Sequence, residues 1–279
     1  MSPRTLRSVR MGTRLLARRP KRGIAVQNLG PTSVRVHQPT GSDGPLPALL
    51  WVHGGGYVLG TAAQDDSLCG LFAQSLGIVV AAVDYRLAPE HPFPVPLHDC
   101  YDALTWLARQ PQVDPARIAV GGASAGGGLA AALALLAHER GEVQLAIQLL
   151  AYPMLDDRTA TRTDIAENNL RLWNNTSNRF AWQSYTGYPP GSVKVSGLAA
   201  PSRYDDLSGL PPAWIGVGTL DLFHDEDVAY DSRLREAGVK CELEIVQGAF
   251  HGFDMIRPKA GVSRAFRFSQ MAALAAALN

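Results

Sequence analysis

Ser124 stands at the centre of the glycine-flanked run Gly122-Ala123-Ser124-Ala125-Gly126. A short apolar run, Ile118-Ala119-Val120, precedes it, and an alanine-rich helical pattern follows as far as Arg140. A strand, a tight turn and a helix in this order form the context in which a serine becomes an exposed nucleophile. Gly122 and Gly126 support this geometry because small residues let the strand and helix backbones approach closely. We therefore predict that Ser124 is a nucleophile; the alternative is a glycine-rich turn with an incidental serine.

A second glycine run, His53-Gly54-Gly55-Gly56-Tyr57, follows the apolar run Ala48-Leu49-Leu50-Trp51-Val52. Consecutive glycines after a strand leave backbone N–H groups free, and a tetrahedral intermediate of acyl transfer needs such donors where negative charge develops. The helix N-terminus behind Ser124 would add further N–H groups and the positive end of a helix dipole. Alone, the glycine run is compatible with a simple loop. Its combination with a later Gly-x-Ser-x-Gly run is typical of lipases and esterases.

A serine hydroxyl needs a general base, and the base needs an orienting acid. Among the seven histidines, His251 follows the predicted strand 243–246 directly. The carboxyl ends of strands are where open α/β sheets gather their ligands. The order of a serine, an aspartate and then a histidine along the chain is also the usual one for this kind of site. We predict that His251 is the base, and we expect His224 to be a surface residue or a neighbour of the site.

The orienting acid should follow the preceding predicted strand, residues 214–217. Four acidic residues come after it: Asp221, Asp225, Glu226 and Asp227. We select Asp221 because it comes soonest after the strand. Asp225 and Glu226 are expected to cap the next helix, where acidic side chains offset the helix dipole.

Short apolar runs alternate with helical patterns along most of the chain, which predicts parallel β-α-β units and a central sheet covered by helices on both faces. The predicted strands are residues 33–37, 48–52, 78–83, 118–120, 146–150, 214–217 and 243–246, and the predicted helices are residues 99–109, 125–140, 226–237 and 262–278. Residues 156 to about 206 lack an apolar strand and are rich in Asn, Trp and Tyr. An insertion of this length usually forms a lid or a binding element.

The composition is that of one large globular domain: 279 residues, 46% hydrophobic and 18% charged, with a formal net charge of +1. A charge so close to zero gives no reason to expect a nucleic-acid partner, and no apolar run reaches membrane-spanning length. The three cysteines, Cys69, Cys100 and Cys241, form no Cys-x-x-Cys pair or Cys/His cluster. We therefore expect no metal site and a reducing, cytoplasmic location. The composition leaves a monomer or a homodimer open.

Residues 1–22 carry eight basic residues and no acidic one. Several of the basic residues recur at three- and four-residue steps, while Leu6, Val9 and Leu16 lie on another side of the same predicted helix. We expect this segment to pack on the body of the protein through its apolar side, with its arginines facing solvent. A transit peptide and a membrane-surface helix are the alternatives. Secretion is not expected, because no apolar core of signal-peptide length follows the basic start.

These motifs, together with the run Asp84–Pro94, resemble the hormone-sensitive-lipase-like family of α/β-hydrolases, the bacterial family IV esterases, from about Trp51 to Phe253. The resemblance implies an α/β-hydrolase fold and the hydrolysis of short- to medium-chain acyl esters, a small-molecule substrate class. It implies no metal or organic cofactor. The residues that it implies for the site are a triad of Ser124, Asp221 and His251, an oxyanion hole formed by the N–H groups of Gly55, Gly56 and Ala125, and the supporting motif residues His53, Gly54, Gly122 and Gly126.

The resemblance also implies a cap, built from an N-terminal segment (residues 1–25) and from the insertion at about 156–206 of a catalytic domain that spans residues 26–279. Ala123 stands where the family usually has Asp or Thr, and Asp221-Leu222-Phe223 replaces Asp-Pro-Leu. Residues 84–94 are expected to be scaffolding, with Arg86 and Glu90 paired. Two alternatives remain for the function. An amidase or formamidase would share every catalytic part, whereas a non-catalytic ligand-binding member of the fold would be expected to lack a triad residue.

Overall fold

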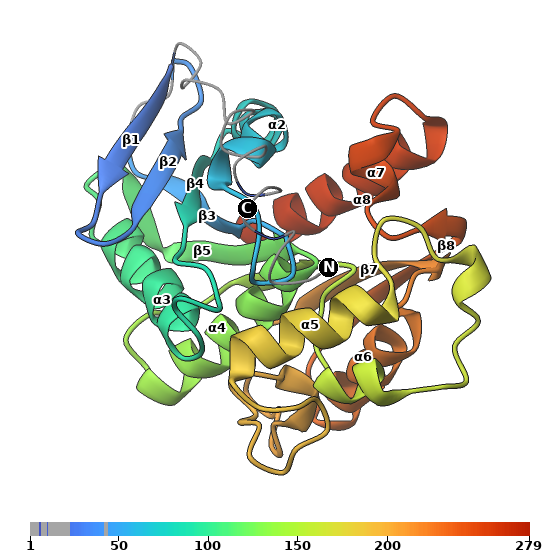
Figure 1. Ribbon diagram of the computed structural model, residues 1–279. Coiled ribbons are helices and arrows are strands. Elements are labelled where there is room, and N and C mark those ends of the chain that lie inside the picture. The colour runs from blue at the N-terminus through green and yellow to red at the C-terminus, as the bar shows by residue number, and fades with distance from the viewer. Residues whose placement is uncertain (1–5, 7–9, 11–22, 42–43) are drawn as a thin grey trace.

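One mixed sheet runs through the molecule, which Figure 1 shows as a computed structural model. The structure describes Leu6, Arg10 and residues 23–41 and 44–279. The strand order is β1-β2-β4-β3-β5-β6-β7-β8, in which β2 runs antiparallel to both of its neighbours and the other neighbouring pairs are parallel. The strands are β1 (Ile24–Asn28), β2 (Ser33–His37), β3 (Leu46–Val52), β4 (Val79–Asp84), β5 (Val113–Ala123), β6 (Ile147–Ala151), β7 (Ala213–Leu220) and β8 (Cys241–Phe250).

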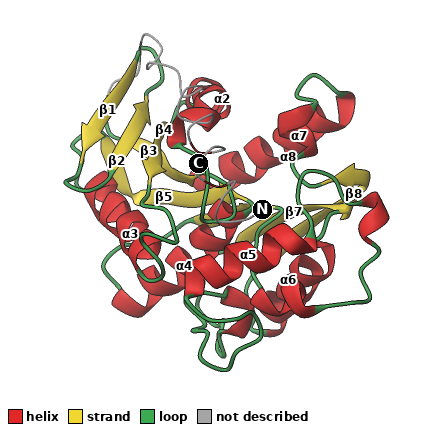
Figure 2. Cartoon of the chain, in the orientation of Figure 1, coloured by secondary structure: helices red, strands yellow, loops and turns green. Residues whose placement is uncertain are grey.

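Helices cover both faces of this sheet, which confirms the predicted fold class (Figures 1 and 2). The helices are α2 (Asp66–Leu76), α3 (Val95–Ala108), α4 (Ala125–Arg140), α5 (Asn175–Thr186), α6 (His224–Glu236), α7 (Phe253–Ile256) and α8 (Gly261–Leu278). Side chains along β3 alternate between the two layers. Leu49 and Trp51 belong to the core that α2 and α8 cover, whereas Leu50 and Val52 belong to the core that α3 and α4 cover. Both sides of the strand are apolar, which explains the continuous apolar runs in the sequence.

The predicted strands and helices are all present, although the structure extends several of them. It also adds β1, α2, α5 and α7, which the patterns did not predict. In β1 only Ile24 is partly buried and the other four residues are exposed, so the strand carries no apolar alternation. In α2 the buried face includes the polar Asp66 beside Cys69 and Phe72, which weakens its apolar stripe.

The insertion at residues 156–206 contains α5 and short 3-10 turns. α5 begins after Asn174, whose side chain accepts a hydrogen bond from Ser177 N at 3.0 Å. It ends at Gly187, which has the left-handed conformation common after helices. The ring of Tyr185, on its buried face, stacks on the ring of Tyr57 with centroids 3.9 Å apart. α5 therefore packs directly on the glycine run that follows β3.

The two described residues of the basic N-terminal segment both contact the body of the protein. Leu6 is buried in the same hydrophobic cluster as Trp173 and Trp182 of the insertion, as expected for an apolar position of this segment. The expectation that the arginines face solvent is wrong for Arg10, whose side chain is only 14% exposed. Val9, Leu16 and the other basic residues, with most of the predicted cap segment 1–25, lie outside the described residues.

The expected pairing of Arg86 with Glu90 is also wrong. Arg86 forms a two-pronged ion pair with the buried Asp99, with Nη2 at 2.7 Å from Oδ1 and Nε at 3.0 Å from Oδ2. Glu90 instead binds Arg10, whose Nη1 lies 2.8 Å from each carboxylate oxygen. Since the expected and the observed partner of Glu90 are arginines of equal charge, sequence alone gave no means to choose between them.

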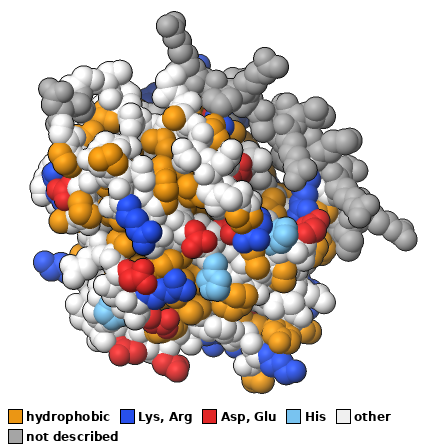
Figure 3. All heavy atoms as spheres, turned by 90° about the vertical axis from the view of Figure 1, so that its left-hand side faces the viewer, with side chains coloured by type: hydrophobic (Ala, Val, Ile, Leu, Met, Phe, Trp, Pro, Cys, Tyr) orange, Lys and Arg blue, Asp and Glu red, His pale blue; other side chains and the backbone are white. Residues whose placement is uncertain are grey.

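Several features that would indicate other kinds of function are not seen in the described part of the chain. On the face in Figure 3, basic and acidic side chains are interspersed, so that face lacks a strong field of one sign. No described helix is both long and apolar enough to cross a membrane. Within the same residues, no group of three or more His, Cys, Asp or Glu side chains is placed to hold a metal ion.

Candidate active site

The residues predicted as nucleophile, base and acid meet at the carboxyl edge of the sheet. Ser124 follows β5, Asp221 follows β7 and His251 follows β8. His251 Nε2 lies 2.9 Å from Ser124 Oγ, and His251 Nδ1 lies 2.8 Å from Asp221 Oδ2. All three residues are buried. Because an ionised carboxylate only accepts hydrogen bonds, we assign the ring proton to Nδ1, which leaves Nε2 to accept the proton of the serine hydroxyl.

Ser124 has a strained backbone conformation, with φ 58° and ψ −125°, where β5 turns into α4. Its N–H donates to Ala151 O on the neighbouring strand at 2.9 Å. The surrounding backbones are so close that a Cβ on Gly126 would lie 2.0 Å from Val52 O, and a Cβ on Gly122 would lie 2.4 Å from Gly126 O. Both glycines are therefore required by packing, and this packing in turn holds the serine at the tip of the turn.

The two main candidates for the orienting acid lie in different surroundings. Asp221 is buried and faces His251. Asp225 has a side chain that is 57% exposed and is bound by Arg162 at 2.7 Å and His224 at 2.9 Å. The structure thus brings Asp221 to His251 and leaves Asp225 and His224 paired with each other outside this arrangement.

The expectation that Asp225 and Glu226 cap α6 is wrong in detail. Both lie in the first turn of α6, but the cap position has no side-chain hydrogen bond. The carboxylate of Glu226 accepts hydrogen bonds from Leu155 N at 2.7 Å and Asp156 N at 3.2 Å, at the start of the insertion. Burial raises the pKa of Glu226 well above its ordinary value. Glu226 therefore ties α6 to the segment that follows β6.

The first glycine run lies beside Ser124. A Cβ on Gly54 would lie 3.3 Å from Ser124 Cβ. Gly55 O accepts hydrogen bonds from Val58 N at 3.2 Å and Leu59 N at 2.9 Å, which closes the run into a tight turn. The φ of Gly55 is 129°, a conformation that L-residues with side chains rarely adopt.

Three N–H groups predicted for an oxyanion hole remain available. Within the described residues, the N–H groups of Gly55, Gly56 and Ala125 donate to no other atom of the chain. Ala125 is also the first residue of α4, so the positive end of the helix dipole lies at the same place. These donors can serve a negative charge that develops on a substrate oxygen next to Ser124.

The side chain of His53 contacts the backbone of this turn. Its ring is fully buried, stacks on Tyr85 with centroids 4.3 Å apart, and has Nδ1 at 2.8 Å from Gly54 O. Burial lowers the pKa of His53. A neutral ring that donates from Nδ1 to Gly54 O accounts for this distance, and it fixes the first peptide of the glycine run.

Two aromatic residues that sequence reasoning did not select pack against the imidazole of His251. Tyr152 and Phe223 meet the imidazole of His251 edge-on, with centroid distances of 4.9 Å and 5.1 Å. The hydroxyl of Tyr152 donates to Asp254 Oδ1 at 2.7 Å, and burial raises the pKa of Asp254. Tyr152 directly follows β6 at the same edge of the sheet, so its place after a predicted strand was a signal that could have found it.

Two consecutive residues of the insertion each lie against a glycine next to the predicted site residues. The six-membered ring of Trp173 lies against Gly56, where a Cβ would be 2.3 Å from it. Leu172 lies against Gly252, next to the base, where a Cβ would be 2.9 Å from its Cδ2. Leu172 is 62% exposed and has a φ of 66°, which is uncommon for leucine. The sequence predicted that the insertion forms a lid or a binding element, but neither residue was assigned to the site.

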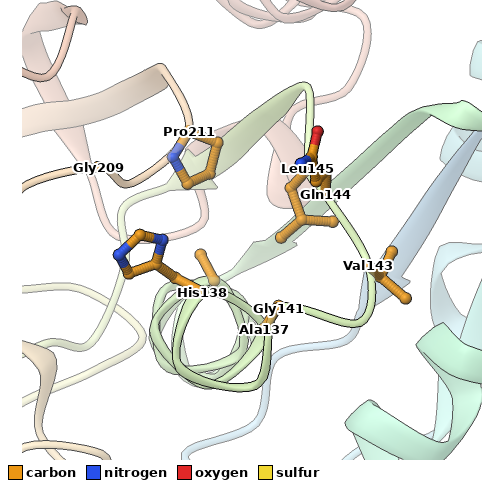
Figure 4. A pocket seen from close by; sticks show the side chains of 9 residues that line it. Ala137, His138, Gly141, Val143, Gln144, Leu145, Gly209 and Pro211 are labelled. Carbon is orange, nitrogen blue, oxygen red and sulfur yellow. The ribbon is translucent and has the colours of Figure 1, made fainter.

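A surface cavity of about 350 Å³ lies at the opposite end of α4 (Figure 4). It is lined by residues of that helix end, of the segment between α4 and β6, and of the segment before β7, among them His138, Val143, Leu145 and Pro211. His138 is thirteen residues beyond Ala125 in α4, which at about 1.5 Å per residue places the cavity roughly 20 Å from Ser124. This cavity is therefore separate from the arrangement around Ser124.

The site combines a serine, a histidine and an aspartate that are linked by hydrogen bonds, and N–H donors beside them are unengaged. Such a site at the strand ends of a mostly parallel sheet is typical of serine hydrolases with an α/β-hydrolase fold. The protein is a member of this class.

Comparisons with known proteins agree with this class. A model of the α/β-hydrolase fold family matches residues 49–255. Esterase LipI of Mycobacterium tuberculosis is 36% identical over 234 residues, which cover 80% of this chain and 71% of that protein. Arylacetamide deacetylase of Oryctolagus cuniculus is 31% identical over an alignment of 284 positions, which covers 78% of this chain and 71% of that protein. The solved structure of a bacterial heroin esterase matches with a TM-score of 0.89 and 37% identity, over 99% of this chain and 92% of that one. The chain belongs to the α/β-hydrolase family, in its hormone-sensitive-lipase-like branch.

Proposed function

We propose that this protein is a carboxylesterase that hydrolyses small acyl esters through an acyl-enzyme on Ser124. The observation that carries this proposal is the continuous chain of hydrogen bonds from Ser124 Oγ through His251 to Asp221. Relatives that are named as esterases support the ester as the bond that is cleaved. The reaction needs water as its only co-substrate.

In the first half of the proposed reaction, Ser124 Oγ attacks the carbonyl carbon of the ester while His251 Nε2 accepts the hydroxyl proton. The carbonyl oxygen becomes negative and accepts hydrogen bonds from the N–H groups of Gly55, Gly56 and Ala125. His251 then gives its proton to the alcohol oxygen, the C–O bond breaks, and the alcohol leaves. In the second half, a water molecule attacks the carbonyl carbon of the acyl-enzyme while His251 accepts a proton from this water. That proton returns to Ser124 Oγ as the carboxylic acid is released.

The acyl chains that the site accepts are proposed to be short to medium in length. Trp173 against Gly56 and Leu172 against Gly252 narrow the space around the nucleophile from two sides. Leu6 is buried in the same hydrophobic cluster as Trp173 and Trp182 of the insertion. We propose that the insertion at 156–206 and the segment around Leu6 together form a cap over the site. Such a cap would exclude water and bound the pocket that receives the acyl group.

Amide hydrolysis is the second candidate, because the same groups would serve it and a deacetylase of arylacetamides is among the relatives. Measuring kcat/KM for p-nitrophenyl esters from acetyl to dodecanoyl, and for the matching p-nitroanilides, separates the two. We expect the esters to be cleaved faster, with a maximum between acetyl and octanoyl. Ser124→Ala should lose several orders of magnitude in kcat. Faster cleavage of the anilides would favour the amidase, and ligand binding without any turnover by the natural protein would favour a non-catalytic member.

A further inference from the structure

Arg10 connects two loops that lie behind the candidate oxyanion hole. Its Nε donates to Val58 O at 2.7 Å, and its Nη2 donates to Ala88 O. Its Nη1 donates to both carboxylate oxygens of Glu90 at 2.8 Å. A guanidinium that is held by two carbonyl groups and a carboxylate has a fixed orientation, because its donors lie in one rigid plane.

The first of these loops is the one that carries the candidate oxyanion donors. Val58, whose carbonyl binds Arg10, donates through its own N–H to Gly55 O at 3.2 Å. Ala88 N donates to Tyr57 O at 3.0 Å, so the second loop is bound to the same stretch of backbone. Val58 therefore links the guanidinium of Arg10 to Gly55 through two hydrogen bonds.

The carboxylate of Glu90 keeps the guanidinium in place rather than supplying much stability of its own. The side chain of Glu90 is 57% exposed, and ion pairs at exposed positions contribute little. Partial burial acts to raise the pKa of Glu90, but the hydrogen bonds from Arg10 are among the interactions that lower it overall. Glu90 is therefore charged at neutral pH and orients the guanidinium toward the two carbonyl groups.

We propose that Arg10 is a positioning residue for the oxyanion hole, an inference that rests on the esterase function proposed above. It holds Val58, and through Val58 the turn at Gly55, in the arrangement that directs the N–H groups of the glycine run toward the reacting carbonyl oxygen. The hydrogen bonds of Arg10 described above are to Val58, Ala88 and Glu90, so its proposed effect on the reaction passes through the backbone of the turn. A displaced turn weakens binding of the transition state more than binding of the substrate, because these donors are fully engaged only when the oxygen becomes negative.

The test replaces Arg10 in the full-length chain by methionine, which keeps an unbranched apolar stem and removes every donor. With p-nitrophenyl acetate we expect kcat to fall by about tenfold or more, short of the roughly hundred- to thousandfold loss that follows outright removal of an oxyanion donor. KM should change by less than about twofold. The inhibition constant of a trifluoromethyl ketone, which forms a tetrahedral adduct with the serine, should rise by the same factor as kcat/KM falls.

A matched control is Arg117→Met, because Arg117 also forms an ion pair, with Asp114 at 2.8 Å, but lies seven residues before Ser124 near the start of β5. This variant should keep the natural kcat. An Arg10→Met variant with natural kcat and natural ketone affinity, whatever its melting temperature, would overturn the proposal. Natural protein that cleaves no ester at all would overturn the proposed function instead.

Milder changes keep the test decisive where Arg10→Met does not fold. Glu90→Gln retains the donors to both carbonyl groups, whereas Arg10→Lys retains the charge but not the planar donor set. We expect kcat to decrease in the order natural protein, Glu90→Gln, Arg10→Lys. Equal kcat values for all three proteins would contradict the inference.

Discussion

Replacing Asp221 by asparagine tests how the acid orients the base. Asp221 Oδ1 accepts a hydrogen bond from Phe223 N at 3.0 Å, and Oδ2 accepts one from His251 Nδ1 at 2.8 Å. An asparagine has one oxygen and one NH₂ group, and the N–H of Phe223 can be satisfied only by the oxygen. The NH₂ group then faces His251 Nδ1, which must become an acceptor. The ring proton moves to Nε2, where it prevents the ring from accepting the proton of Ser124.

The expected loss in kcat is large. The corresponding change in a related triad lowers kcat by about ten-thousandfold, which corresponds to about 5.5 kcal/mol of transition-state stabilisation. The fold should be preserved, because the asparagine has the same shape and keeps one hydrogen bond. We therefore expect a melting temperature close to that of the natural protein and kcat lower by three to four orders of magnitude.

Asp225→Asn, four residues further along in the first turn of α6, is the control. Its carboxylate is exposed and binds Arg162 and His224, so its loss should alter kcat by less than about threefold. The assay is hydrolysis of p-nitrophenyl acetate at saturating substrate, with circular dichroism to verify folding. Equal losses in the two variants, or a larger loss for Asp225→Asn, would refute the assignment of the acid.

Three further changes test packing, the cap and a buried acid. Gly126→Ala should destabilise the protein by roughly 1–3 kcal/mol in urea unfolding, since its Cβ would lie 2.0 Å from Val52 O; Gly261→Ala, with open space around its Cβ, should not. Trp173→Ala should raise kcat/KM for decanoyl relative to acetyl esters by about tenfold, and an unchanged ratio would exclude Trp173 as a wall of the acyl pocket. Burial raises the pKa of Asp65 from 3.8 to about 7, so the folded state binds the proton more tightly and the free energy of unfolding falls as pH rises from about 4 to 7. This fall amounts to at most about 4 kcal/mol. Asp65→Asn can still accept the hydrogen bond from Trp51 and should abolish the fall. An unchanged pH dependence of the unfolding free energy in this variant would contradict the raised pKa.

The parts of this protein that could be predicted from sequence are those with local signals. The glycines around Ser124 are required by the close approach of β5, α4 and β3, and that requirement leaves a spacing that can be read directly. The buried parallel strands are apolar on both faces, so each appears as a short apolar run. Asp221 and His251 each follow such a run, which is why the order of strand ends predicted that they would lie near Ser124.

The parts that could not be predicted depend on contacts with no local pattern. Two of the acceptors of Arg10 are the carbonyl groups of Val58 and Ala88. Every residue has a backbone carbonyl, so the sequence does not indicate which ones an arginine will bind. Trp173 reaches Gly56 through the packing of an insertion of about fifty residues, whose path no periodicity specifies. Glu226 looked like a helix cap because it lies in the first turn of α6, but a tertiary hydrogen bond to Leu155 N replaced that local role.

The most direct test of Ser124 as the nucleophile of an acyl-transfer site is to treat the protein with a fluorophosphonate and to locate the adduct by mass spectrometry of its peptides. We expect one adduct per chain, on Ser124, formed in parallel with the loss of ester hydrolysis and blocked by the trifluoromethyl ketone. A stoichiometric adduct on any other residue, or complete inactivation without modification of Ser124, would contradict the account.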